Sequence, residues 1–143
     1  MASVTRTDAR LGWTVEQCRH AYGKERSCFI WKDYPKITIC TFNNARFEIY
    51  AHFMQGTVTA VEYFAKDKAS FTRDTVLDLL SQNSLDPSQT WDEFDDVDPN
   101  ARRLFQLGDE QGNLIASADF YDKTDPPKLI IMLKQEMNYL KAP

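Results

Sequence analysis

The sequence predicts an α+β fold in which short helices pack against a mostly antiparallel sheet. Three observations lead to this prediction. Apolar and polar residues alternate through 37–42 and 46–53, and the 57–64 run that follows is rich in β-branched and aromatic residues. Turn-forming residues separate these runs, as a meander requires. Two further stretches combine helix-capping signals with apolar residues spaced three and four apart.

The first helix is predicted over Val15–Tyr22. Thr14 and Gln17 match the S/T-x-x-E/Q capping box, and Trp13 is placed to pack as a hydrophobic staple. Gly23 is a typical stop. The next stretch, 27–32, has strand composition, and Tyr34-Pro35 turns it toward the meander, which gives a four-stranded first half.

The second half begins with a helix over 73–82, capped by Thr72. Residues 83–100 then predict a long loop held at two isolated aromatic residues. A second hairpin follows at 103–107 and 114–120. The apolar run 128–133 suits a strand or a buried helix, and its isoleucines and the preceding prolines favour the strand. The sequence leaves 134–140 ambiguous between these structures.

We therefore expect a flexible arm at 1–10 and a single α+β domain at 11–143, with two helices and six or seven strands. The order of elements suggests two helix-plus-meander half-units, 11–66 and 70–133, although no residue-level repeat accompanies it.

Composition narrows the classes of partner. The net charge of −4 and the absence of a Lys/Arg block argue against nucleic acid and anionic lipid. No apolar run approaches the ~20 residues of a membrane-spanning helix. Because Met1–Arg10 lacks the apolar segment of a signal peptide, we expect either a cytoplasmic protein or the mature form of an exported one.

The three cysteines, Cys18, Cys28 and Cys40, are an odd number without C-x-x-C spacing, so we expect buried or half-buried thiols and neither a disulfide framework nor a zinc site. Thiol catalysis would need Cys18 with His20 or Cys40 with His52. The first two point apart on a helix, and the second pair is at best diagonal across the hairpin.

The densest acidic cluster, 91–100, contains Asp96-x-Asp98-x-Asn100, which imitates the start of a calcium loop. Ala101 and Leu107 replace the glycine and glutamate that such a loop needs, so we expect a solvated acidic loop and no metal. No known cofactor motif is present, and we expect no cofactor.

The opening Leu11-Gly12-Trp13-Thr14-Val15-Glu16-Gln17-Cys18, then Tyr22-Gly23-Lys24, then a sheet containing 47–53 and 58–63, resembles the small outer-membrane-assembly lipoproteins and the tandem-repeat β-lactamase inhibitor protein. It also resembles uncharacterised exported bacterial domains with a similar start. The resemblance implies a short helix on an antiparallel meander and a protein-binding function. The chain departs from the pattern in having Glu25 where a proline is usual, no lipid-attachment cysteine and no matching disulfide cysteines.

Aromatic residues are more numerous than the core of a small sheet needs. If Trp31, Tyr50 and Tyr63 share the sheet face away from the helices, they form a partly exposed platform. The candidate binding residues are then Trp31, Arg46, Glu48, Tyr50, His52 and Tyr63. The competing expectation is that a helix or a second sheet covers this face.

Three hypotheses follow. The leading one is a non-enzymatic protein-binding or inhibitor-like module with an unidentified protein partner, using the aromatic face and the acidic loop. The alternative is a small ligand-binding domain or enzyme with a pocket near Tyr50, His52 and Cys40. The third is self-association, with the aromatic face as a homodimer interface.

Overall fold

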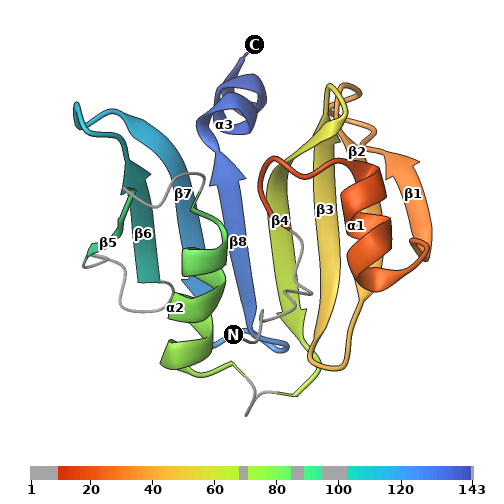
Figure 1. Ribbon diagram of the computed structural model, residues 1–143, viewed down its shortest axis with the longest axis horizontal. Helices are drawn as coiled ribbons and strands as arrows, with labels where there is room; N and C mark the ends of the chain where they lie inside the picture. The colour runs from red at the N-terminus through yellow and green to blue at the C-terminus, as the bar shows by residue number, and fades with distance from the viewer. Residues whose placement is uncertain (1–9, 68–70, 85–88, 95–102, 143) are drawn as a thin grey trace, which may run out of the picture.

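The computed structural model describes residues 10–67, 71–84, 89–94 and 103–142, and within them it shows three helices and one eight-stranded antiparallel sheet (Figure 1). The predicted α+β class is thereby confirmed. In chain order the elements are α1 (Val15–Tyr22), β1 (Ser27–Ile30), β2 (Thr38–Asn43), β3 (Phe47–Met54), β4 (Thr57–Ala65), α2 (Arg73–Gln82), β5 (Trp91–Phe94), β6 (Arg103–Gly108), β7 (Leu114–Tyr121), β8 (Lys128–Leu133) and α3 (Lys134–Lys141).

The sheet consists of two four-stranded meanders joined side by side. Its strand order is β1-β2-β3-β4-β8-β7-β6-β5, and each meander follows one helix, α1 or α2. The seam is the antiparallel pairing of β4 with β8, in which Val61 lies opposite Ile131 and Tyr63 opposite Leu129. The last strand of each meander therefore lies at the centre of the sheet, and β1 and β5 lie at its edges.

Both predicted helices occupy their expected positions for the expected reason. Thr14 caps α1 in a full capping box with Gln17, and Gly23 ends the helix with a φ of 87°. The Thr72 hydroxyl accepts a hydrogen bond from the Thr75 N–H at the start of α2. Side-chain oxygens thus satisfy amide groups that a helix N-terminus leaves without intrahelical acceptors.

α1 and α2 pack on the same face of the sheet, which we call the helix face (Figure 1). Cys18 of α1 and Leu79 of α2 are buried in one continuous core with alternate residues of the strands. Its buried members from the sheet are Cys40, Phe42, Phe47, Ile49, Ala51, Phe53, Val58, Val61, Tyr63, Ala65, Phe105, Leu107, Ala116, Ala118, Phe120, Leu129 and Ile131.

The opposite face, which we call the far face, carries a second and smaller cluster. Ile37, Ile39 and Met54 are buried there, and partly buried aromatic and aliphatic residues pack around them. Two of these, Tyr139 and Leu140, belong to α3. α3 therefore covers one end of the far face while α1 and α2 cover the helix face.

Two segments of the prediction need correction. The residues placed in a long loop include β5, whose four residues Trp91–Phe94 pair with β6, so eight strands replace six or seven. The ambiguous 134–140 segment is a third helix. β5 is short and mostly exposed, so it carries little apolar alternation, and α3 has no side-chain cap to mark its start.

Some expectations lie outside the described residues. These include most of the proposed N-terminal arm and the calcium-loop imitation at Asp96–Asn100. In the part of the chain that the structure describes, no helix is long and apolar enough to cross a membrane.

Candidate functional site

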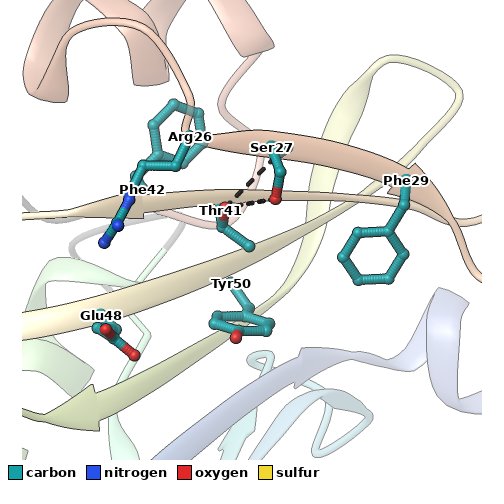
Figure 2. A pocket seen from close by; sticks show the side chains of 7 residues that line it. All are labelled: Arg26, Ser27, Phe29, Thr41, Phe42, Glu48 and Tyr50. Atoms are coloured by element: carbon teal, nitrogen blue, oxygen red, sulfur yellow. Dashed lines mark hydrogen bonds between the residues drawn. The ribbon is translucent and has the colours of Figure 1, made fainter.

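A hollow of about 420 Å³ lies where β1, β2 and β3 meet at one end of the sheet. In Figure 2, Arg26 and Glu48 stand toward one end of the space and Phe29 toward the other, with Tyr50 between them. Ser27 and Thr41 join across the opposite wall through their hydroxyls, which are 2.9 Å apart. Its lining residues are Arg26, Ser27, Phe29, Thr41, Phe42, Glu48 and Tyr50. The hollow offers a carboxylate, a guanidinium, three hydroxyls and aromatic rings.

Beside this hollow runs β1, an edge strand that is exposed at all four positions. Its two large apolar side chains, Phe29 and Ile30, are 46% and 65% exposed. Strand alternation places Phe29 on the far face, toward the hollow, and Ile30 on the helix face. Exposed apolar side chains on a sheet edge are typical of a surface that receives another chain.

A disulfide joins β1 to the rest of the sheet. Cys28 and Cys40 lie directly opposite each other and form it, with their Cα atoms 4.1 Å apart. The expectation of three thiols is therefore wrong for these two. The spacing of the cysteines could not reveal this disulfide, because the pairing depends on the register of β1 against β2 and involves no C-x-x-C motif. Only Cys18 of the three is a free cysteine, and burial raises the pKa of its thiol to about 12.

The same geometry shows which backbone groups of β1 face outward. A Cα separation of 4.1 Å is typical of a narrow, non-hydrogen-bonded antiparallel pair, so Cys28 and Ile30 direct their N–H and C=O groups away from β2. In agreement, the Trp31 N–H turns inward and donates to the Ile37 carbonyl. None of the described strands pairs with the outer edge of β1.

The structure brings together some of the predicted binding residues. Glu48 and Tyr50 line the hollow, and Tyr50 stacks edge-on against Phe64 of the neighbouring strand at a centroid distance of 5.2 Å. Trp31 lies on the same face but packs into the cluster under α3, beside Tyr34 and His52. Trp31 and Tyr50 are half-buried, so the expected open platform is partly covered.

Tyr63 and Arg46, the other two predicted binding residues of this set, lie away from the hollow and from the cluster under α3. Tyr63 is fully buried on the helix face, because it alternates with Val61 and Ala65, and its hydroxyl accepts a hydrogen bond from Asn83. Arg46 precedes β3 in the turn, and its guanidinium lies 5.0 Å from the ring of Phe47, a helix-face residue. The shared face expected for Trp31, Tyr50 and Tyr63 is therefore wrong for Tyr63.

His52 is buried in a network of charged side chains beneath α3. Its Nδ1 is 2.9 Å from Glu136 Oε2 and its Nε2 is 2.7 Å from Glu62 Oε2. The Thr59 hydroxyl donates to Glu136 Oε1 at 2.8 Å. Burial lowers the pKa of His52, but the hydrogen bonds and charges of Glu136 and Glu62 outweigh burial and raise it from 6.5 to about 9.

Tyr50, His52 and Cys40, the residues of the alternative hypothesis, do not line one pocket. Tyr50 faces the hollow, His52 is enclosed under α3, and Cys40 lies on the helix face in the disulfide. Among the residues described, no group of three or more His, Cys, Asp or Glu side chains could hold a metal ion.

Sequence reasoning missed several lining residues of the hollow, namely Arg26, Ser27, Phe29, Thr41 and Phe42. The strand registers would have revealed three of the lining residues. With β1 paired to β2 and β2 to β3, Ser27, Thr41 and Tyr50 lie side by side in one cross-strand row. Glu136 gave no signal, since it belongs to the segment whose structure the sequence left ambiguous.

Comparison with known proteins assigns this chain to no family. No protein-family model matches the chain, and no curated protein matches it. A solved structure of a cysteine-rich secretory protein from Staphylococcus aureus is similar, with a TM-score of 0.49 and 8% sequence identity over 89% of this chain. The chain spans about half the length of that protein, 46%.

Proposed function

We propose that this protein is a non-enzymatic protein-binding module that receives an extended segment of a partner along β1. The observation that carries the proposal is β1 itself: an edge strand with outward N–H and C=O groups, exposed apolar side chains and an adjoining hollow. An added strand satisfies such backbone groups, and pockets beside the strand select alternate side chains of the bound segment.

The chemistry of the hollow indicates what the segment carries. Phe29 and Tyr50 offer ring surface to an apolar or aromatic side chain, while Arg26 and Glu48 offer one charge of each sign at one end. A bound strand presents every second side chain to the far face. We therefore propose an extended segment with one large apolar residue, flanked two positions away by a polar or charged residue.

The disulfide supports this role because it holds the edge strand in place before a partner arrives. A preorganised strand loses less conformational entropy on binding than a frayed one. The Cys28–Cys40 bond fixes β1 to β2 near the middle of the strand, on the helix face of the sheet.

A displayed library of random peptides, panned against the purified chain, tests the proposal. Selected peptides should bind the Phe29→Ser variant at least about tenfold more weakly, a loss of about 1.4 kcal/mol. Leu77→Ser is the matched control, because Leu77 is similarly exposed, at 41%, but lies on α2. Equal weakening by both variants, or by neither, would contradict a site at β1.

Self-association through β1 is a separate outcome. Sedimentation of the chain alone would then show a dimer that Phe29→Ser dissociates, since two copies of an antiparallel edge strand can pair about a two-fold axis. That result would replace the peptide partner by a second copy of the chain.

A further inference from the structure

When both Glu136 and Glu62 are ionised, the network beneath α3 requires a doubly protonated imidazole. Both nitrogens of His52 lie within hydrogen-bond distance of carboxylate oxygens, at 2.9 Å and 2.7 Å. An ionised carboxylate only accepts hydrogen bonds, so each nitrogen must carry a proton to donate one. A neutral imidazole would leave one nitrogen lone pair facing a carboxylate, with both atoms buried or half-buried.

α3 depends on this network to an unusual degree. Glu136 is the only side chain of this helix that is fully buried, where an amphipathic helix ordinarily buries apolar residues. Its two oxygens accept hydrogen bonds from His52 on β3 and Thr59 on β4. The helix follows β8 directly, so Leu133 is the point beyond which it can leave the sheet.

The other contacts of α3 are neutral or weak. The Tyr34 hydroxyl donates to the Leu140 carbonyl at 3.4 Å, and the Lys36 N–H donates to the Tyr139 hydroxyl at 3.2 Å. Tyr139 meets Tyr34 edge-on at 5.7 Å, and the Ser117 hydroxyl lies 3.3 Å from the sulfur of Met137. These hydrogen bonds lie at or beyond the long end of the usual range.

We propose that α3 is a pH-sensitive strap, which a protonated His52 holds against the far face and which leaves that face when His52 loses its proton. Its release uncovers the aromatic cluster of Trp31, Tyr34 and Tyr50. Tyr50 also lines the hollow, but the proposal requires no partner and stands apart from the binding function.

The groups that face His52 fix the direction of the effect. Glu62 faces it from β4 and Glu136 from α3, both as acceptors, while Trp31 and Ile39 contribute uncharged surface. The basic group among the α3 contacts described above is Lys36, whose Nζ lies over the Tyr139 ring at 5.7 Å. Among these contacts, no cation lies where it could take the place of the His52 imidazolium between Glu62 and Glu136.

The sign follows from the pKa of His52, which is about 9 in the folded protein and 6.5 without these partners. A group whose pKa is raised by folding stabilises the fold fully below its unfolded value. The stabilisation that protonated His52 contributes is therefore complete below about pH 6.5 and is lost as the pH rises through about 9. Docking of α3 should weaken on the alkaline side.

The test uses the full chain with Trp13→Phe and Trp91→Phe, which leaves Trp31 as the fluorescent reporter beside His52. Trp31 emission should shift between about pH 7.5 and 10. Over the same range, hydrogen-exchange protection of 134–141, corrected for intrinsic rates, should fall at least about tenfold, since one pKa unit is a factor of ten in the equilibrium. An unchanged Trp31 signal and unchanged protection would overturn the proposal.

Two variants separate the strap from a merely structural ion pair. In Glu136→Gln or Glu62→Gln the amide can donate to a neutral imidazole, so α3 should remain docked and its alkaline transition should disappear. Glu62→Gln leaves every residue of α3 intact and serves if Glu136→Gln does not fold. Glu110→Gln, an exposed carboxylate in the β6–β7 turn, is the control and should keep the wild-type transition. A wild-type transition in either folded variant, Glu136→Gln or Glu62→Gln, would also overturn the proposal.

Discussion

Asn83 ties three parts of the molecule together through one buried side chain. Its Oδ1 accepts from the Leu11 N–H at 3.0 Å, and its Nδ2 donates to the Leu79 carbonyl at 2.8 Å and to the Tyr63 hydroxyl at 3.2 Å. The residue is 1% exposed. A buried polar group that loses its hydrogen-bond partner is costly in free energy. The Asn83 amide therefore stabilises the fold by keeping several such groups paired.

Asn83→Ala should lower the free energy of unfolding by about 2–3 kcal/mol, because it removes the acceptor of the buried Leu11 N–H. Tyr63→Phe is the matched control. It loses one hydroxyl contact and keeps the ring, so it should cost only about 1 kcal/mol. Urea unfolding measures both. An Asn83→Ala loss no larger than that of Tyr63→Phe would contradict the bridging role.

The cysteines predict a simple thiol count. Folded protein treated with a thiol reagent should label at no cysteine, because Cys18 is buried and its pKa is raised to about 12. Denatured, non-reduced protein should label at one cysteine per chain. Mass spectrometry reads both results, and three labels in the denatured sample would contradict the Cys28–Cys40 disulfide.

For single residues, the sequence predicted the roles that depend on neighbours close in the chain. The caps Thr14 and Thr72 and the stop at Gly23 depend on neighbours within four residues, and the structure places them as predicted. His52 depends instead on Glu136, 84 residues away, and Cys28 depends on the register of two strands. Partners so distant in sequence cannot be found from spacing alone.

Among the elements, β1 is the one on which the proposed function depends. It is only four residues long, and none of its side chains is buried. Such a strand gains little from packing, so the disulfide to β2 supplies much of what holds it in the sheet. A disulfide that closes a loop of this size is typically worth about 3 kcal/mol.

The double variant Cys28→Ala/Cys40→Ala should lose about 2–3 kcal/mol of stability and should expose the inward-facing amides of Phe29 and Trp31 to rapid hydrogen exchange. Cys18→Ala, which keeps the disulfide, controls for loss of a cysteine and should leave β1 protected. Should the amides of Phe29 and Trp31 remain equally protected in the double variant, β1 would not depend on the disulfide.

Elements were predictable where their apolar pattern was long. The strands β2, β3 and β4 are six to nine residues long and carry alternation or β-branched and aromatic runs, and their predicted positions agree with the structure within one residue. β5 has four residues with three exposed, and α3 buries a glutamate in place of an apolar stripe. Neither has the periodicity that sequence analysis recognises.

Viewed as a whole molecule, the two meanders share one hydrophobic core. The β4–β8 seam places Val61 beside Ile131 and Tyr63 beside Leu129, and all four are fully buried on the helix face. A continuous core across the seam should couple the folding of the two halves.

Unfolding should therefore occur in one transition. Single-tryptophan variants that keep only Trp13, before α1, or only Trp91, in β5, should give the same denaturation midpoint. Ile131→Ala at the seam should destabilise both signals equally, by about 2–4 kcal/mol. Two separate midpoints would show that the meanders unfold independently.

The order of helices and meanders was visible in the sequence, but their joining through β4 and β8 was not. Residues 57–65 and 128–133 are far apart in the chain, and each run alone is equally compatible with an edge or a central strand. The same limit applies to the hollow, because three strands and their registers form it together. Local patterns set the elements, and long-range pairing sets the site.

The most direct measurement of the proposed function compares Ile30→Pro with Ile30→Ser in binding a peptide selected on the wild-type chain. Both variants remove the exposed side chain, but only proline also removes the outward N–H of β1. If the partner adds a strand to β1, Ile30→Pro should bind at least about tenfold more weakly than Ile30→Ser. Equal affinity of the two folded variants would contradict strand addition and with it the account of β1 as the binding edge.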